Sequence, residues 1–470
     1  MDQPTCTGCL ERDARIARLE TEMAELRAQL DELKARLGLN ASNSSIPPSA
    51  NPPQAPPPVV KKPTGRKPGG QPGHQAHLRL RLPADRLTEP TRHYWPKRCR
   101  ACELPLSKSH APGDPEPRWH QVVELPEFPV EVTEHLAHGS ICSCGEVTWG
   151  QIPATILNRV CGPRLTATFS FLSGVMHASK RRIEEFAETV LQAPIALGTI
   201  SNLEQEMSAA LEAAHAEAQK AVQEAEAKNV DETGWKQAGV KRWLWGAATT
   251  LVACFVIAPS RGMAGLTALL GETIKGIVSS DRWSVYSRLK LGLRQLCWAH
   301  LKRDFQKLVD RGGVGKPYGE MGLAVVQKLF HEWHLFLGGG SRSKMQAVME
   351  LLRFDMRNWL KEGERCSDAR AAAFCENLLD LEPAMWKFVR NSDKGVEPTN
   401  NPIERHLRPG VLWRKNAFGC HSAGGCRFVE RILTVVQTLR LQKRPVMQFL
   451  TDSLLAHRGG LPAPKLILGQ

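Results

Sequence analysis

Three carboxylates in the sequence, Asp231, Asp281 and Glu404, have neighbours that suit metal-dependent chemistry on phosphodiesters. Asp231 stands where a long helical stretch gives way to strand-like sequence, and Asp281 ends a short apolar run, 276–281, typical of a buried strand. Glu404 lies at the start of a helical pattern. Mg²⁺ prefers hard oxygen ligands, and two such ions can steady the attacking and leaving oxygens of an in-line displacement. Because most carboxylates are solvated surface charges, the assignment rests on these local contexts.

The contexts form an ordered set of short words along the chain. They are NSSIPPS at 43–49, GRKPGGQPGH at 65–74, DETGW at 231–235, SDRW at 280–283, CWAHLKR at 297–303, NNPIER at 400–405, LRP at 407–409 and RKN at 414–416. Together these words resemble transposases of the insertion-sequence-66 type, a DDE family with an RNase H-like catalytic core. No single word is specific, whereas the ordered set covers nearly the whole chain.

The resemblance implies an enzyme that cuts DNA at the ends of a mobile element and joins the 3′-hydroxyl to target DNA. Asp231, Asp281 and Glu404 would then hold Mg²⁺ or Mn²⁺, and Glu232 should point to the other face of the sheet because strand neighbours alternate. The implied partners are double-stranded DNA at element ends and target, with accessory proteins of the element as further candidates. The alternative is a catalytically inactive, zinc-containing DNA-binding protein derived from a transposase.

Basic residues cluster around the expected glutamate helix, where they suit phosphates near the scissile bond. An ordinary solvated basic helix would show the same pattern. The residues are Arg405, Arg408, Arg414 and Lys415.

Two further groups near the motifs have competing interpretations. Trp235, Trp283 and Trp298 could stack on flipped bases, but packing in the core is expected for most of them. The pair Cys297 and His300 has the spacing of metal ligands, and a core position with a phosphate contact is the preferred interpretation.

Two pairs of cysteines predict a structural zinc site. The pairs are Cys99 with Cys102 and Cys142 with Cys144, in a segment with too little apolar sequence to form a core alone. The resembling family usually has CxxC in both pairs, so the CxC spacing of the second pair leaves one ligand open. The candidate replacements are His93, His110, His135 and His138. Residues 122–132 are expected to form a strand between the pairs. Cys6 and Cys9 form another CxxC, an independent clip or no site at all.

Apolar residues in steps of three and four near the N-terminus predict a coiled coil. The seam consists of Ile16, Leu19, Met23, Leu26, Leu30, Leu33 and Leu37. A single helix packed on its own protein is the alternative, and self-association is favoured. The Pro-rich linker that follows has a basic part that could lie along phosphates or serve as a solvated spacer. Its basic residues are Lys61, Lys62, Arg66 and Lys67.

Residues 156–228 are expected to be helical. An N-capped start at Ser179, a break near Pro194 and a second start near 198–203 resemble a helix-turn-helix, although any helical hairpin gives a similar pattern. Residues 203–228, rich in Ala and Glu, are expected to form a spacer helix.

The core should contain three strands, at 229–234, 242–250 and 251–258, then a helix at 262–271 and the strand ending at Asp281. A strand at 295–299 is expected to lead into a helix at 300–310. A helical insertion before the glutamate helix would explain the long gap from Asp281 to Glu404, and Val429 to Leu441 is expected to close the core as an amphipathic helix.

The predicted fold class is multidomain α+β. Its domains are a coiled coil at 10–38, the linker at 39–78, the zinc-binding domain at 79–155, the helix-turn-helix-like segment at 156–228, the RNase H-like core at 229–310 and 393–445, the helical insertion at 311–392 and a tail at 446–470. A formal charge of +14 and a pI near 9.3 favour a polyanionic partner. Thirteen cysteines without a disulfide framework, no signal-peptide pattern and no long apolar run predict a DNA-associated protein of the bacterial cytoplasm.

Overall fold

The computed structural model describes residues 14–26, 39–44, 81–109, 112, 114–126, 130–153, 156 and 159–468. The chain divides into two compact units. One consists of Met1–Pro56 with Glu134–Gln470, and the other is Pro57–Thr133. Within the described ranges, no helix is both long enough and apolar enough to cross a bilayer.

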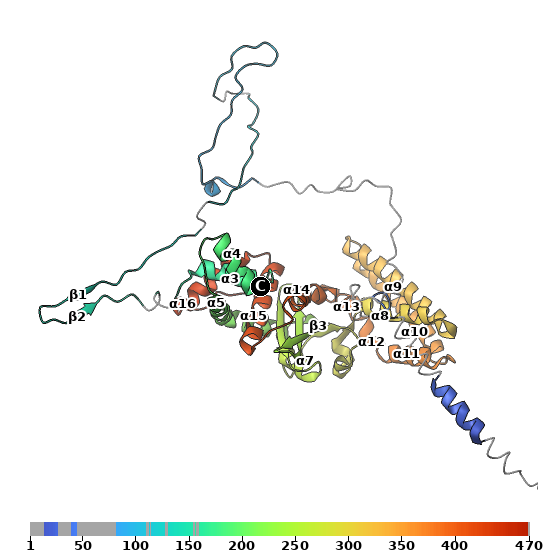
Figure 1. The fold of residues 1–470 in the computed structure, drawn as a ribbon. Coiled ribbons are helices and arrows are strands. Elements are labelled where there is room, and N and C mark those ends of the chain that lie inside the picture. Colours follow the sequence, from blue (N-terminus) through green and yellow to red (C-terminus); the bar gives the residue numbers. More distant parts are fainter. Residues whose placement is uncertain are drawn as a thin grey trace, which may run out of the picture. The chain divides into compact units, whose positions relative to one another are not determined.

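A mixed five-stranded sheet forms the centre of the larger unit (Figure 1). Its strand order is β5-β4-β3-β6-β7, in which β3, β4 and β5 are antiparallel neighbours and β6 and β7 run parallel to β3. The strands are β3 (Ala227–Gln237), β4 (Val240–Ala248), β5 (Ala253–Ala258), β6 (Ile277–Ser280) and β7 (Arg294–Leu296). The predicted succession of three strands, a helix and another strand is therefore confirmed, with α7 (Met263–Leu270) as the helix.

Two boundaries of the sheet differ from the prediction. The β3–β4 hairpin extends several residues beyond the expected strand ends, because Ala238 and Gly239 both have positive φ and make the tight turn that antiparallel strands favour. The strand expected at 295–299 is wrong in its second half. Only Arg294–Leu296 is strand, and α8 (Trp298–Arg311) starts after Cys297.

Different helices cover the two faces of the sheet. On one face, a Cβ added to Gly246 of β4 would meet Ile403 and Leu407, so α14 (Asn401–Ala417) packs there. On the other face, a Cβ added to Gly265 of α7 would meet the ring of Trp245. Since Gly246 and Trp245 are consecutive in β4, their opposite contacts identify the two faces directly.

The edge strand β5 is capped by α15 (Ala423–Leu441), a helix expected from the sequence to be core. The backbone N–H groups of Ala253 and Phe255 donate to the hydroxyls of Thr438 and Thr434, at 3.1 and 3.0 Å. That of Ile257 donates to Glu430 Oε1 at 2.6 Å. Acceptors spaced four residues apart on one helix thus satisfy alternate donors of the strand, which would otherwise be free to pair with another chain.

The Ala- and Glu-rich segment is not a spacer, so the prediction for residues 203–228 is wrong. Its α6 (Glu212–Glu224) buries Ala214, Ala218 and Val222 in the main core, and His215 Nε2 contacts the carbonyl oxygen of Phe255 at 3.0 Å. The buried face consists mainly of alanines. These small side chains let the helix lie close to β5 while its glutamates stay at the surface.

Residues 311–392 contain helices in place of further strands. They are α9 (Lys316–Leu337), α10 (Arg342–Gly363), α11 (Ala369–Asp380), α12 (Glu382–Met385) and α13 (Lys387–Asn391). With α8 they enclose a second hydrophobic cluster that includes Phe305, Trp359 and Leu360. Figure 1 shows these helices at one side of the sheet and α3, α4 and α5 at the other.

The segment from residue 159 forms α3 (Pro163–Gly174), α4 (Lys180–Thr189) and α5 (Leu197–Ala210). Ser179 caps α4 as predicted, since its hydroxyl accepts from the N–H of Arg182. The residues after 445, expected to be a tail, contain α16 (Val446–Gly459), which packs on α3 and α5. Its Arg458 donates to Glu206 at 2.7 Å and to the carbonyl oxygen of Cys161 at 3.0 Å, which holds the helix in place.

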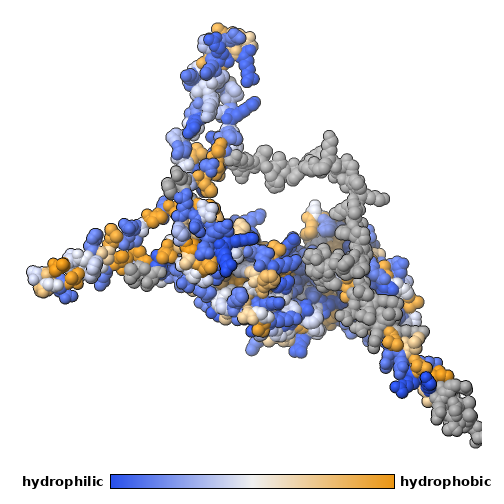
Figure 2. Space-filling view, viewed as in Figure 1, coloured by the Kyte–Doolittle hydropathy of each residue, from blue (hydrophilic) through white to orange (hydrophobic). Residues whose placement is uncertain are grey.

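Two small elements precede these helices. Residues 14–26 are helical, with Ile16, Leu19, Met23 and Leu26 all about half exposed. The hairpin of β1 (Gly139–Ile141) and β2 (Val147–Trp149) is likewise exposed along its whole length. Figure 2 shows hydrophobic side chains on the surface of both.

The strand expected at 122–132 is wrong. None of the described residues in this range is in a strand. Pro126 has no backbone N–H to donate, and no described strand pairs with the segment. The described 3₁₀ helices are η2 (Ala84–Arg86), η3 (Ser284–Arg288), η4 (Leu291–Leu293), η5 (Gly313–Gly315) and η6 (Ser392–Lys394).

Candidate active site

Asp231 lies in the middle of the central strand β3, opposite Gly246 of β4. Its Oδ1 accepts a hydrogen bond of 2.9 Å from the N–H of Glu232. Burial raises the pKa of Asp231 well above its usual range, and the charges of Glu232, Asp281 and Glu404 raise it further. These charges act on Asp231 from the same region of the fold, where Asn400, four residues before Glu404, donates to the carbonyl oxygen of Val230.

Asp281 follows directly after β6, the parallel neighbour of β3. Asn229 pairs with Ser279, and continuing this register by two residues brings Asp281 level with Asp231 on the same side of the sheet. Asp281 Oδ1 accepts from the N–H of Trp283 at 2.8 Å, which orients the carboxylate. Parallel strands thus bring two aspartates, fifty residues apart in the sequence, to one position.

Glu404 occupies the first turn of α14, which Pro402 helps to start. Its carboxylate is partly exposed and its Oε1 has no hydrogen-bond partner. Burial raises the pKa of Glu404. The charge of Asp281 adds to this shift, whereas that of Arg303 opposes it. Buried Ile403 and Leu407 of the same helix pack toward Gly246, which holds this turn against the sheet.

Asn400, the residue before α14, joins the helix to both neighbouring elements. Its Nδ2 donates to the carbonyl oxygen of Val230 at 2.8 Å, and its backbone N–H donates to Cys297 Sγ at 3.1 Å. The N–H of Trp298 donates in turn to the carbonyl oxygen of Pro398 at 2.9 Å. Since Val230 precedes Asp231, these bonds fix the distance between the glutamate helix and the strand that carries Asp231.

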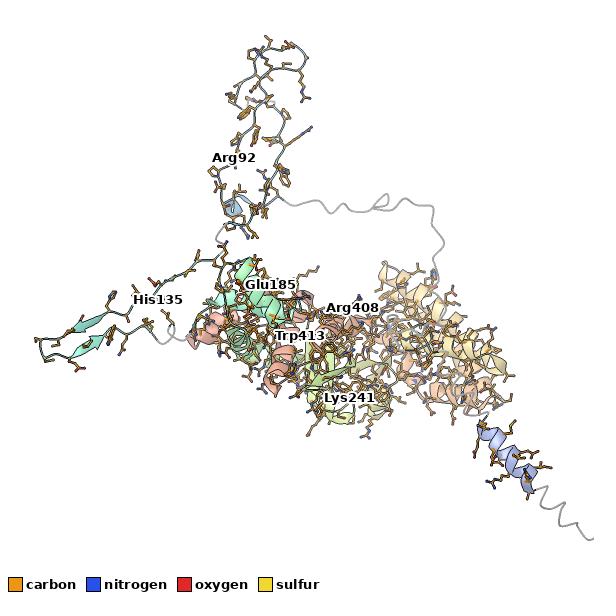
Figure 3. The ribbon with its side chains drawn as sticks, viewed as in Figure 1. Arg92, His135, Glu185, Lys241, Arg408 and Trp413 are labelled. Carbon is orange, nitrogen blue, oxygen red and sulfur yellow. The ribbon has the colours of Figure 1, made fainter. Side chains whose placement is uncertain are left out.

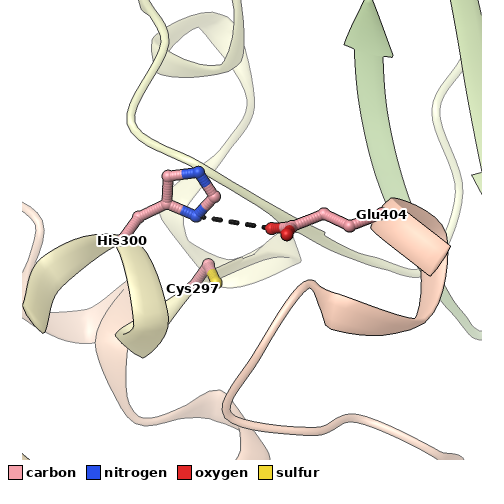
Figure 4. Close-up of side chains that lie close together, drawn as sticks. All are labelled: Cys297, His300 and Glu404. Carbon is pink, nitrogen blue, oxygen red and sulfur yellow. Dashed lines mark ion pairs between the residues drawn. The ribbon is translucent and has the colours of Figure 1, made fainter. Parts of the chain in front are cut away.

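Cys297 and His300 lie beside Glu404 (Figure 4). The donor atoms of these three side chains all lie within 4.8 Å of one another, and His300 Nδ1 is 3.8 Å from Glu404 Oε1. Burial lowers the pKa of His300 to about 4, and the charge of Arg303 lowers it further, so the ring is neutral near pH 7. The preferred core position is confirmed for Cys297, which is 2% exposed. The sequence did not predict that Cys297 would lie next to Glu404.

Glu232 has contacts of its own, on the face away from α14. Tyr286 Oη donates to Glu232 Oε2 at 2.7 Å, and Arg261 Nε donates to Oε1 at 2.8 Å. Burial raises the pKa of Glu232, and these two hydrogen bonds lower it. The Arg261 guanidinium also lies 3.8 Å from the ring centre of Trp283. These contacts agree with the predicted alternation of Asp231 and Glu232.

The tryptophans near the motifs separate into two kinds. Trp235 and Trp298 are almost fully buried, so their predicted core packing is confirmed. Trp283, two residues after Asp281, is 39% exposed, and sequence reasoning gave no means to distinguish it from the others.

The predicted basic residues on α14 have different environments. Arg405, Arg408 and Lys415 are exposed, and Figure 3 shows Arg408 on this helix. Arg414 instead donates to Thr233 Oγ1 at 3.2 Å and to the carbonyl oxygen of Gly234, so it joins α14 to β3. The other four basic candidates, Lys61, Lys62, Arg66 and Lys67, lie outside the described residues.

Each cysteine pair lies in a tight turn. The N–H of Ala101 points at Cys99 Sγ at 3.4 Å, and this backbone donor lowers the pKa of the thiol. The backbone near Cys144 similarly lowers the pKa of Cys142, at the tip of the β1–β2 hairpin. The two pairs belong to different compact units, so a four-thiolate site remains a prediction.

The predicted α+β class is confirmed: the structure is a mixed sheet covered by helices, with candidate carboxylates on two parallel strands and an adjoining helix. The chain belongs to the transposase IS66 family, whose model matches residues 159–427, more than half of the sequence. Residues 3–80 match a family of unknown function, DUF6444.

Two curated relatives from Sinorhizobium fredii (strain NBRC 101917 / NGR234) are similar to part of the chain. The uncharacterized protein y4qI is 25% identical over 253 residues, which are 48% of this chain and 46% of that protein. The uncharacterized protein y4hP is 28% identical over 203 residues, or 38% of this chain and 36% of that protein. The chain thus matches less than half the length of either relative.

Proposed function

We propose that this protein is a DNA transposase that binds the ends of an insertion sequence and catalyses strand cleavage and strand transfer. The carboxylates of Asp231, Asp281 and Glu404 are its catalytic residues, and double-stranded DNA is its substrate. The observation that carries the proposal is that the β3–β6 register brings Asp281 level with Asp231 and that Asn400 joins the start of the Glu404 helix to β3, in a chain of the transposase IS66 family.

The topology supports an RNase H-like core. Three antiparallel strands are followed by a helix and then by two strands parallel to the first, in the order β5-β4-β3-β6-β7. The central strand and its parallel neighbour each supply an aspartate. The glutamate arrives on a helix after the long helical insertion, as the resemblance implies.

The donor set fits divalent metal ions. Burial raises the pKa of Asp231, the charges of Glu232, Asp281 and Glu404 raise it further, and Glu404 Oε1 has no hydrogen-bond partner, so a bound cation would favour the charged form of these carboxylates. Mg²⁺, or Mn²⁺ in its place, would be held by Asp231, Asp281 and Glu404. When bound, such ions offset the charge of the phosphodiester and make a water or 3′-hydroxyl oxygen more nucleophilic at neutral pH.

The protein's own residues contribute position and charge. Asn400 and Arg414 hold the glutamate helix against β3, so that the carboxylates do not have to reorganise when DNA binds. Arg405 and Arg408 lie on the exposed side of that helix, where their guanidinium groups can contact phosphates. Such contacts contribute affinity without sequence information.

The test is cleavage and joining of labelled DNA that carries the element's own ends, with and without Mg²⁺. We expect Asp231→Asn, Asp281→Asn and Glu404→Gln each to reduce cleavage to the metal-free background. DNA binding should be retained, since affinity comes mainly from Lys and Arg. Asp355→Asn, which changes an exposed aspartate of α10, is the matched control and should keep full activity.

Two results would contradict this proposal. Near-normal cleavage by Glu404→Gln would remove Glu404 from the site. Specific binding of the ends by the wild-type protein, without cleavage in Mg²⁺ or Mn²⁺, would instead favour the inactive DNA-binding protein.

A further inference from the structure

We propose that Cys297, His300 and Glu404 form a second kind of metal site, for a single divalent cation of the Zn²⁺ class. The site shares Glu404 with the candidate active site but takes its other ligands from the start of α8 (Figure 4). Its existence does not depend on the proposed function. Only its effect on DNA cleavage does.

The geometry is close to that of a tetrahedral centre. Ligand bonds of 2.0–2.3 Å to Zn²⁺ separate neighbouring ligand atoms by about 3.3–3.8 Å. His300 Nδ1 and Glu404 Oε1 are 3.8 Å apart, and the sulfur completes a set in which all donor atoms lie within 4.8 Å. Displacements of the three ligand atoms by up to about one ångström would complete the coordination.

Two of the three donor atoms have no hydrogen-bond partner within the protein. His300 Nδ1 and Glu404 Oε1 are both inaccessible to solvent and have no hydrogen-bond partner. Buried polar atoms nearly always have a hydrogen-bond partner. Two buried polar atoms that both lack a partner and lie next to each other are therefore unusual. A cation between them satisfies both at once, whereas neither atom offers the other a good hydrogen bond at 3.8 Å.

Burial raises the pKa of the Cys297 thiol to about 11, and backbone donors led by the N–H of Asn400 lower it, so a bound cation would have to displace the thiol proton. Cys297 is the residue that caps α8, and its Sγ accepts from the N–H of Asn400 at 3.1 Å. Backbone donors at a helix N-terminus favour a negatively charged sulfur, and such N–H···S bonds also orient a thiolate that binds a metal. Cys297 and His300 are three residues apart across the first helical turn, which places both on the same side of the helix.

The ligand types decide which cation fits. A thiolate and an imidazole select borderline or soft ions such as Zn²⁺ over Mg²⁺. The thiolate and the Glu404 carboxylate together have a charge of −2, and the guanidinium of Arg303 is the nearby positive group. Three protein ligands leave a fourth position, on the side where the Glu404 side chain is 37% exposed and Cys297 is not.

Occupancy of this site would withdraw Glu404 from the three-carboxylate cluster. If the proposed function holds, Zn²⁺ then competes with Mg²⁺ for one shared ligand and suppresses cleavage. Cys297 and His300 would then make the enzyme sensitive to trace zinc, although its proposed cofactor is magnesium.

The test measures binding without DNA and without catalysis. Co²⁺, a spectroscopic substitute for Zn²⁺, is titrated into the metal-stripped full-length protein, and the thiolate-to-cobalt absorption band is recorded. The wild-type protein should bind one more equivalent than Cys297→Ala and His300→Gln, and excess Mg²⁺ should not displace that equivalent. Cys375→Ala, which changes a buried cysteine of α11 outside the proposed ligand set, is the matched control and should behave like the wild type.

Comparison among variants is essential because the cysteine pairs at 99–102 and 142–144 are predicted to bind a metal ion as well. The proposal is overturned if the wild type and both site variants bind equal amounts with the same band. Circular dichroism checks that each variant folds. If Cys297→Ala does not fold, cobalt binding by His300→Gln, which changes a partly exposed side chain, decides whether the site exists. An absence of DNA cleavage would reject the proposed function and leave this binding result unaffected.

Discussion

Gly246 and Asp231 lie directly opposite each other on β4 and β3, and the glycine leaves room for the helix that carries Glu404. A Cβ at residue 246 would lie 3.0 Å from Ile403 Cδ1 and 3.1 Å from Leu407 Cδ2. The absence of one side chain on β4 therefore allows Ile403 and Leu407 to pack directly on the strand that pairs with Asp231.

We expect Gly246→Ala to impair catalysis more than DNA binding. The added methyl group crowds Phe255 Cε1, at 2.9 Å, as well as the two side chains of α14, and overpacks the core at a cost of about 1–3 kcal/mol in the free energy of unfolding. Denaturant unfolding and end-cleavage assays measure the two effects. Gly198→Ala is the control, because nothing lies within 4 Å of its added Cβ. Equal cleavage rates in both variants would show that the approach of α14 is not limiting.

Replacement of Asn400 by aspartate should destabilise the protein. The side chain would present an acceptor to the carbonyl oxygen of Val230, where Asn400 now donates at 2.8 Å. A buried acceptor left unpaired costs about 1–3 kcal/mol, more when charged. Asn416→Asp, on the exposed part of the same helix, should change the unfolding free energy by less than about 0.5 kcal/mol. Similar unfolding midpoints for the two variants would contradict this account of Asn400.

The buried carboxyl group of Glu430 should make the free energy of unfolding depend on pH. Burial raises its pKa to about 7 from an ordinary value of 4.5, while Ile257 N–H donates to it. Between these values the folded state keeps a proton that the unfolded state loses, so the free energy of unfolding falls as pH rises and the penalty is complete above pH 7.

Glu430→Gln should remove that penalty while keeping an amide oxygen for Ile257. We expect the variant to gain about 1–3 kcal/mol relative to wild type at pH 8 and to match it near pH 4. Unfolding curves at both pH values measure this, with the exposed Glu185→Gln of α4 as control (Figure 3). A gain of the same size at both pH values would rule out ionisation as its cause.

The cysteine pairs predict about one zinc ion per chain held by Cys99, Cys102, Cys142 and Cys144, beyond any at Cys297. Elemental analysis of purified protein should find this zinc, and Cys99→Ser and Cys102→Ser should lose it. Cys366→Ser, outside both pairs, is the control. Zinc that persists in Cys144→Ser but not in Cys99→Ser would identify a histidine as the fourth ligand, and zinc-free wild-type protein would end the hypothesis.

The exposed apolar stripe of residues 14–26 predicts weak, concentration-dependent self-association. Leu19→Lys with Leu26→Lys places charges in the stripe and should shift the protein toward monomer in sedimentation experiments. Ala17→Lys with Ala24→Lys adds the same charge to the helix outside the stripe and should leave association unchanged. Monomeric behaviour of the wild type at micromolar concentration would contradict the coiled coil. The remaining seam positions, Leu30, Leu33 and Leu37, lie outside the described residues.

Local sequence was sufficient to predict an element where a short motif contains both the candidate residue and the pattern of the helix or strand that carries it. The apolar run before Asp281 and the change of period at Asp231 predict strands with an aspartate at a defined point, and the structure has those strands. The strand predicted through residue 299 failed, because an apolar run does not reveal where a helix begins.

The remaining features depend on contacts between distant residues. The alanines of α6 are buried only because β5 lies against them, and α16 is fixed by an Arg458–Glu206 contact across 252 positions. The proximity of Glu404 to Cys297 and His300 is likewise invisible locally. The CxxH spacing was the available signal, and its third member comes from the other side of the helical insertion.

The order in which the site residues occur in the chain also governs how the site assembles during synthesis. Both aspartates and the paired strands β3 and β6 emerge before the roughly 120 residues that precede Glu404. A nascent or truncated chain that ends before α14 therefore holds two carboxylates without the third. Since domains fold as they leave the ribosome, the three-carboxylate centre would be completed only after α14 has been translated. If the proposed function holds, an interrupted polypeptide would then be unable to cut the DNA around it.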